Sequence, residues 1–203
     1  MNIDFLAEVQ SARPEERAWL ALEYALGSFD KPVREAVWAA AIPHWFDANF
    51  LGALMNESEA TVLPLLKNLV SLPFVEVFPG RGYNIHSASR ELLLKRLWKN
   101  NRMRYREISR RAADFCLRQD QADTGWRAET IYHLLIARPE EGTIRLEEAC
   151  EDCRVRTHRA VNEIDAMMRA YSEHAEAERL PRDQSGILLV EAMADFLLGG
   201  LSS

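Results

Sequence analysis

Residues 74–86 read FVEVFPGRGYNIH, and their composition differs from that of the segments on either side. Aromatic and β-branched residues flank a turn at residues 79–82, Pro-Gly-Arg-Gly, which is the pattern of a β-hairpin. A two-stranded hairpin is only marginally stable alone, so its apolar side chains are expected to pack on neighbouring helices while its Pro-Gly tip faces solvent. No other part of the sequence reads clearly as a pair of strands.

The segments before the hairpin have apolar residues at helical spacing and residues typical of helix ends. Pro14 is placed to open a helix, and Gly27 is placed to end it. Asp30, Asp47 and Ser58 are candidate N-caps of three further helices, because their side-chain oxygens accept from the free N–H groups of a first turn. The last of these helices is expected at about residues 58–72.

The segments after the hairpin read as a longer series of helices. They are expected at residues 88–99 and 102–118, and at about 127–137, 143–153, 155–178 and 185–198. A loop is expected at Thr124-Gly125, and Pro139 and Gly142 are interpreted as helix breakers. The predicted fold class is mainly α: a winged helix with one β-hairpin followed by stacked helical hairpins. Residues 1–99 form the N-terminal helices and the winged helix, and residues 100–203 form the helical-hairpin region.

Charge is distributed unevenly along the chain, whose formal net charge is −6. Residues 90–118 hold ten Lys or Arg and three Asp or Glu, whereas both flanking regions are acidic. Such a segment either attracts an anionic partner or pairs with the chain's own acidic surfaces. The candidate anion-binding or nucleic-acid-binding residues are Lys95, Arg96, Lys99, Arg102, Arg104, Arg106, Arg110 and Arg111.

A winged helix raises the question of DNA binding, and the helix expected at 58–72 bears on it. Lys67 is its one basic residue, and Glu57 and Glu59 stand at its entrance. Helices that read the major groove usually present Arg, Lys, Asn or Gln to base edges, with other basic groups on the phosphates. Protein is therefore the favoured partner, and a nucleic-acid-binding regulator that uses residues 95–111 is the alternative.

Several other functional classes have little support in the sequence. No run approaches the roughly 18 apolar residues of a membrane span, and the N-terminus lacks the features of a signal peptide, so a cytoplasmic protein is expected. Cys150-x-x-Cys153, with His158 nearby, is at most half of a zinc site. Three histidines are isolated in the sequence: His44, His133 and His174. We expect no enzymatic activity, no metal and no cofactor.

The region 36–97 resembles the winged-helix arm of STAND-type signal-transduction ATPases. AVWAAAIPHWFDANFLGALM (36–55) is similar to that family's helix pair with an FD…FL..L pattern, and YNIHSASR (83–90) is similar to the Y.(L/M)HD..R element after its wing. RYREISRRAADF (104–115) and AETIYHLLIA (128–137) resemble the start of the helical superhelix that often follows the arm.

The resemblance implies a role for His86, whose counterpart in the family contacts the phosphate of a bound nucleotide. The alternative is a histidine packed at a strand–helix junction. Arg90 is expected to pair with an acid or to cap carbonyl groups. Ser87 stands where the family has an acidic residue, and the sequence contains no G-x-x-x-x-G-K-[ST] loop, so the ATPase core itself is missing. The expected function is a non-catalytic regulatory and interaction module, either a fragment of a larger ATPase or a stand-alone piece, that docks on a protein partner such as an ATPase core in cis or in trans.

Overall fold

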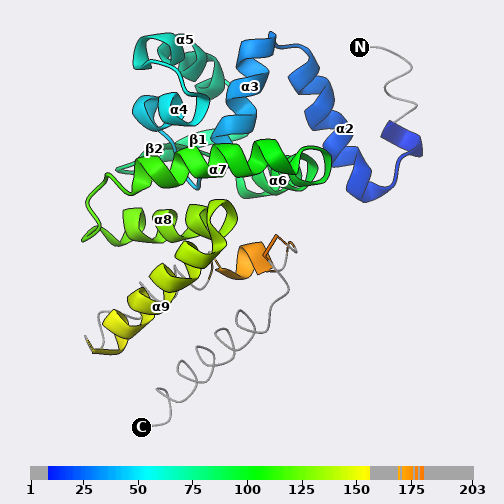
Figure 1. Cartoon of the computed structure of the whole chain (residues 1–203). Coiled ribbons are helices and arrows are strands. Elements are labelled where there is room, and N and C mark those ends of the chain that lie inside the picture. Colours follow the sequence, from blue (N-terminus) through cyan, green and yellow to red (C-terminus); the bar gives the residue numbers. More distant parts are fainter. Residues whose placement is uncertain (1–8, 156–168, 170, 176, 178, 181–203) are drawn as a thin grey trace. The chain divides into compact units, whose positions relative to one another are not determined.

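The computed structural model describes residues 9–155, 169, 171–175, 177, 179 and 180. This part of the chain is mainly helical with one small two-stranded antiparallel sheet, as the sequence predicts (Figure 1). The elements are α2 (Pro14–Gly27), α3 (Lys31–Ala40), α4 (Ala48–Met55), α5 (Glu59–Val70), β1 (Val75–Phe78), β2 (Gly82–Ile85), α6 (Ser87–Asn100), α7 (Arg102–Cys116), α8 (Thr124–Ala137) and α9 (Pro139–Val155). The chain divides into two compact units, Met1–Ile108 and Ser109–Ser203, so the boundary falls inside α7.

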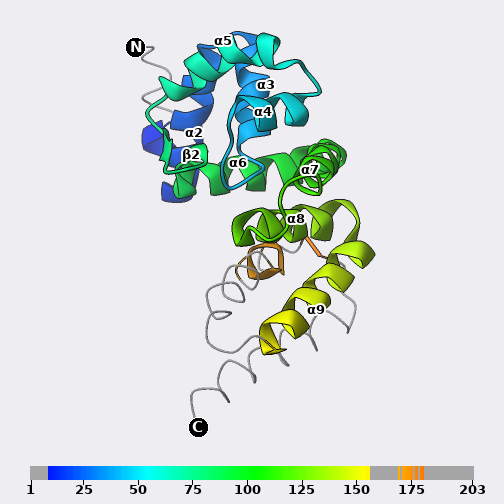
Figure 2. The same cartoon turned by 90° about the vertical axis from the view of Figure 1, so that its left-hand side faces the viewer.

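Helices α3, α4 and α5 of the first unit pack against one another (Figure 2). Their inward positions carry aliphatic and aromatic side chains that are fully removed from solvent: Val37, Phe50, Leu54, Val62 and Leu69. Burying one such large side chain stabilises the folded state by about 1.5–3 kcal/mol. These helices therefore owe their stability mainly to the shared core.

Two of the three predicted N-caps are confirmed by their hydrogen bonds. The Asp47 carboxylate accepts from the backbone N–H of Phe50 at 2.8 Å, and the Ser58 hydroxyl oxygen accepts from the N–H of Thr61 at 3.3 Å. Asp30 stands at the predicted N-cap position of α3, but its side chain makes no capping hydrogen bond. Pro32 lies in the first turn of α3 and has no N–H, so one of the usual donors to a cap is absent.

The hairpin is tied to the helices through its second strand. β1 and β2 pair with Val75 opposite Ile85, and an isolated bridge joins Tyr83 to Phe46, just before α4. Tyr83 and Phe46 exchange two backbone hydrogen bonds of 2.7 and 2.9 Å. Gly82 is required beside this bridge, because its φ is +106° and a Cβ there would lie 2.6 Å from the carbonyl oxygen of Phe46.

The hairpin packs on the helices unevenly. Ile85 is buried, whereas Val77 is 70% exposed. The Pro-Gly tip faces solvent as expected. Arg81, next to the tip, is half-buried, and its guanidinium carbon lies 4.9 Å from the ring centre of Trp45.

In the second unit, α8 and α9 pack as a helical hairpin. The loop predicted at Thr124-Gly125 is wrong, because α8 already begins at Thr124. The Asp123 carboxylate accepts from the N–H groups of Gly125 and Trp126 at 2.9 and 3.1 Å, and this cap starts the helix earlier than composition suggests.

The interpretation of Gly142 as a breaker is also wrong. α9 begins at Pro139, whose missing N–H suits a first helical turn, and it continues through Gly142. A Cβ at Gly142 would lie 2.5 Å from the backbone nitrogen of Leu135 in α8. The glycine therefore serves close packing of the two helices.

Some predictions fall where the structure gives little or no description. The helix expected at 185–198 and His158 lie outside the described residues, as do the side chains of Cys150 and Cys153. Of the helix expected at 155–178, residues 171–175 are described and helical. Among the described residues, every helix is too short or too polar to span a membrane.

Candidate functional site

His86 lies at the junction between β2 and α6. Its backbone N–H donates to the carbonyl of Phe74 at 2.8 Å, and its carbonyl accepts from the N–H of Arg90 at 2.9 Å. The residue occupies the N-cap position of α6, but its side chain makes no capping bond and is exposed. The backbone of His86 is thus fixed while its imidazole is open to solvent.

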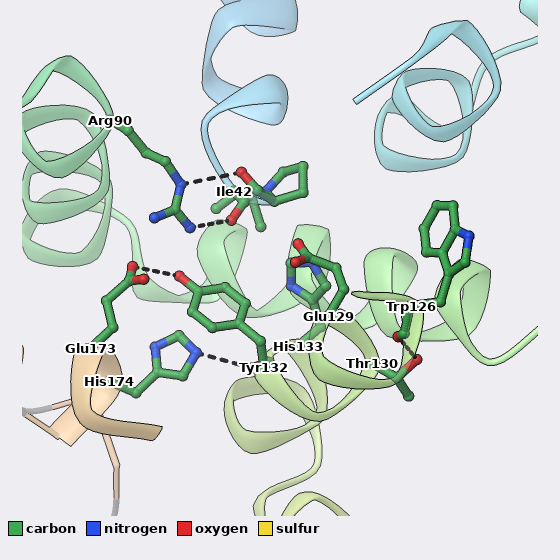
Figure 3. A network of polar contacts seen from close by, with 10 residues as sticks. Ile42, Arg90, Trp126, Glu129, Thr130, Tyr132, His133, Glu173 and His174 are labelled. Atoms are coloured by element: carbon green, nitrogen blue, oxygen red, sulfur yellow. Dashed lines mark hydrogen bonds and ion pairs between the residues drawn. The ribbon is translucent and has the colours of Figure 1, made fainter. Parts of the chain in front are cut away.

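Arg90, in the first turn of α6, links the same junction to the end of α3. Its side chain is buried, with Nε donating to the carbonyl of Pro43 at 3.1 Å and Nη2 donating to the carbonyl of Ile42 at 3.0 Å (Figure 3). Both acceptors lie just after α3, where carbonyl groups lack helical partners. Arg90 therefore caps carbonyl groups, one of its two expected roles, and fixes the first turn of α6 to the end of α3.

Two arginines of the basic segment form ion pairs within their own units. Arg104 pairs with Glu35 of α3, and Arg110 pairs with Asp114 at 2.9 Å one turn later in α7. Asp114 also accepts from Arg138 at 3.0 Å. For these two arginines, the expectation that the basic segment pairs with the chain's own acidic groups is therefore confirmed.

Other members of the segment lie over aromatic rings. The Arg96 guanidinium carbon is 4.6 Å from the ring centre of Trp19. Those of Arg102 and Arg106 are 5.1 and 5.8 Å from the ring centre of Trp98. Lys95 and Lys99 are exposed on α6, and Arg111 is half-buried in the second unit. Of the eight candidate residues, those from Lys95 to Arg106 belong to the first unit, and Arg110 and Arg111 belong to the second.

A buried polar network in the second unit was missed by the sequence reading. His133 and Glu129, one turn apart on α8, are both almost fully buried, and their Nε2 and Oε1 atoms lie 3.0 Å apart. The hydroxyl of Tyr132 donates to the Glu173 carboxylate at 2.8 Å, and Nε2 of His174 donates to the carbonyl of Tyr132 at 2.9 Å (Figure 3).

Ring contacts and charges complete this network. The His174 imidazole stacks on the Tyr132 ring with centres 4.0 Å apart, and Arg179 lies 3.7 Å from Glu173. His133 contacts the same tyrosine ring edge-on at 5.1 Å. His133 and His174, which are isolated in the sequence, thus contact the same tyrosine ring in the structure. Glu129 and His133 could have been paired from their i, i+4 spacing, but Tyr132 and Glu173 are 41 residues apart and nothing local links them.

Burial shifts the pKa values of two groups in this unit, His174 and Cys116. Desolvation, with the positive charge of Arg179 adding to it, lowers the pKa of His174 to about 3, so the ring is neutral at physiological pH. Burial and the charge of Glu129 raise the pKa of the Cys116 thiol far above its ordinary range. A thiol that stays protonated is a poor nucleophile, and buried imidazoles cannot reach a dissolved substrate. The network joins Tyr132 of α8 to Glu173 and His174 through hydrogen bonds.

Comparisons with known proteins add no assignment. No family model, no curated protein and no solved structure matches this chain significantly. Within the described residues, no group of three or more His, Cys, Asp or Glu side chains is placed to hold a metal ion. Any functional conclusion therefore depends on the geometry of the chain itself.

Proposed function

We propose that this chain is a non-catalytic regulatory module that works by docking on a protein partner, in the manner of the winged-helix arm of a STAND-type ATPase. The observation that carries the proposal is the exposed imidazole of His86 on a braced backbone. In this proposal His86 contacts the phosphate of a nucleotide held by an ATPase core, either in the same polypeptide or in a separate one.

The order of elements in the first unit supports a winged helix. Three packed helices, α3 to α5, precede the hairpin, and the Phe46–Tyr83 bridge adds a short third strand position before α4. A hairpin that follows packed helices in this order is consistent with a wing beside a helix-turn-helix pair. A fold alone does not determine a function, so this order supports the proposal only together with the His86 site.

The chemistry of the junction suits a sensor of an anionic group. An imidazole can donate to a phosphate oxygen, and the free N–H groups of the first turn of α6 favour negative charge nearby. Arg90 ties this turn to the end of α3 by two hydrogen bonds. In the proposal, a displacement of His86 on docking therefore moves α3 with it. A rigid connection of this kind is what transmission by rigid-body docking requires.

The surface of α5 favours a protein partner over duplex DNA. Leu63 and Val70, seven residues apart on one face, are 43% and 38% exposed, and Lys67 between them is the one cation. Glu57 and Glu59 are exposed at the start of the helix. Apolar and acidic groups at these positions hold no phosphates, and they are not the Arg, Lys, Asn or Gln side chains that usually read base edges.

The test places a photo-crosslinking amino acid at position 86 of the protein in its native host. After irradiation, mass spectrometry identifies the attached peptide. We expect a peptide from a nucleotide-binding core that contains a phosphate-binding loop, in cis or in trans, and a crosslink yield that changes when ATP is depleted. Attachment only to proteins without such a loop contradicts the proposal.

Glu91 provides the matched control position. It is exposed on the same helix, further from the junction, and has no expected role at a nucleotide. The same crosslinker at position 91 should give little of the product and no dependence on ATP. Equal yields and equal ATP responses at positions 86 and 91 would show that position 86 does not contact the nucleotide-binding core specifically.

A further inference from the structure

The corner between α6 and α7 forms a second distinctive surface on the first unit. A single residue, Asn101, separates the two helices, and its side-chain oxygen accepts from the N–H of Arg104 at 2.9 Å. We call this surface the Trp98 corner and define it by six residues: Lys95, Trp98, Lys99, Arg102, Met103 and Arg106.

The Trp98 corner has a strong local excess of positive charge. Lys95 and Lys99 are exposed one turn apart on α6, and Arg102 and Arg106 are exposed one turn apart on α7. Within the part of the chain that the structure describes, none of these four is paired with a carboxylate, whereas the neighbouring Arg104 is paired with Glu35. The corner therefore presents four cations to a ligand that supplies negative charge.

The two arginines are held in place by the ring of Trp98. Their guanidinium carbons lie 5.1 and 5.8 Å from the ring centre, and Tyr105 contacts the same ring edge-on at 5.4 Å. Cation–π attraction of this kind orders a side chain before a ligand arrives, which lowers the entropy lost on binding. An ordered guanidinium fork is suited to bidentate binding of a carboxylate.

Two features favour an acidic protein segment over a nucleic acid. Nucleic-acid sites of low sequence specificity use open aromatic faces on which bases stack, but guanidinium groups already occupy the Trp98 ring. Met103, directly after Arg102, is 83% exposed and offers an apolar anchor. Trp, Met and Arg are the residues that protein interfaces favour over ordinary surface.

We infer that the Trp98 corner binds an acidic segment of a partner protein that also carries a large apolar side chain. Carboxylates of the partner pair with Arg102 and Arg106, the apolar side chain packs on Met103, and Lys95 and Lys99 attract the segment over a longer range. This surface does not include His86 and requires no ATPase core, so the inference does not depend on the proposed function.

The test is selection of a random 16-residue peptide display library on the purified full chain. We expect the enriched peptides to contain several Asp or Glu residues and at least one Leu, Ile, Phe or Trp. A synthetic copy of the best peptide should lose at least about 10-fold in affinity on the double change Arg102→Glu and Arg106→Glu, because two charge-assisted contacts become repulsive. Met103→Ala should weaken the same peptide about 3-fold to 10-fold without any change in charge.

The control makes the same change of charge elsewhere on the unit. Lys31 and Lys67 are exposed on α3 and α5, and their replacement by Glu should leave peptide affinity within about 2-fold at 0.15 M salt. Circular dichroism checks that each variant remains folded. Failure to enrich acidic peptides, or equal affinity losses in both double variants, overturns the inference. So does a single-stranded thymidine 20-mer that displaces the peptide and binds more tightly than it does.

Discussion

Arg90 donates a hydrogen bond of 3.0 Å to the carbonyl oxygen of Ile42, although 48 residues separate them in the sequence. A second donor of the same side chain reaches the next carbonyl, that of Pro43. The two bonds close a loop that contains α4, α5 and the whole hairpin. Arg90 is thus a long-range connection in the first unit as well as a neighbour of His86.

We expect Arg90→Ala to lower the free energy of unfolding by about 2–4 kcal/mol, because two carbonyl groups beneath α6 lose their donors. Arg90→Lys should recover only part of the loss, because one ammonium group does not reproduce the guanidinium fork. Urea unfolding followed by far-ultraviolet circular dichroism measures both variants.

Arg96→Ala is the control for this comparison. Arg96 lies on the same helix but contacts the face of Trp19 at a half-exposed position. Such a contact contributes about 0.5–1 kcal/mol. If Arg96→Ala destabilised the protein as much as Arg90→Ala, the buried bonds to α3 would not be the source of the effect.

Gly142 gives a test of the second unit. Gly142→Ala should cost about 2–3 kcal/mol, because the new methyl group would meet the backbone of Leu135, which cannot move aside as a flexible side chain could. The cost arises despite the better intrinsic helix propensity of alanine, worth about 1 kcal/mol. Thermal and urea unfolding of the variant measure the difference.

Gly27 is the matched control, because it also lies in a helix but has no atom within 4 Å of the position that a Cβ would take. Gly27→Ala should therefore be neutral or stabilising by up to about 1 kcal/mol. Opposite signs for the two glycines are the expected result. A neutral Gly142→Ala would mean that α8 and α9 do not approach so closely.

Sequence reasoning succeeded where the determining contacts are local. Asp47 and Ser58 cap helices that begin one residue later, so their roles follow from a few neighbouring positions. The hairpin followed from strand-forming residues around a Pro-Gly turn. In each case, hydrogen-bonding groups or backbone preferences of adjacent residues determine the structure.

Sequence reasoning failed where contacts between residues of different elements determine the structure. Gly142 has the composition of a breaker, and only the approach of Leu135 explains its place inside a helix. The partner of Arg104 is Glu35, 69 residues away, and no local pattern identifies it. The network around Tyr132 is of the same kind, because tertiary packing alone brings His174 onto its ring.

The hairpin offers a contrast between two residues of similar chemistry. Ile85 is 2% exposed and Val77 is 70% exposed. Ile85→Ala should cost about 2–4 kcal/mol, as large-to-small changes in a core do, whereas Val77→Ala should cost less than about 0.5 kcal/mol. The urea midpoints of the two variants measure these losses of stability. Similar losses would mean that both faces of the hairpin are covered.

The buried imidazole of His174 makes a prediction about pH. Its pKa is about 3 in the folded chain, below the ordinary value of 6.5, because burial disfavours the charged ring and Arg179 repels it. Below pH 6.5 the unfolded chain takes up a proton that the folded chain does not. The contribution of His174 to stability is therefore present in full above pH 6.5 and is lost as pH falls from about 6.5 toward 3, at up to about 1.4 kcal/mol per pH unit.

Comparison with a residue that cannot titrate separates this effect from the acid sensitivity that carboxylates give any protein. His174→Gln retains an amide that can donate to the Tyr132 carbonyl, so we expect it to fold and to lose stability less steeply between pH 6.5 and 4. Urea unfolding at half-unit pH steps gives the two curves. Parallel curves for the parent and His174→Gln across that range would show that burial does not hold the ring neutral.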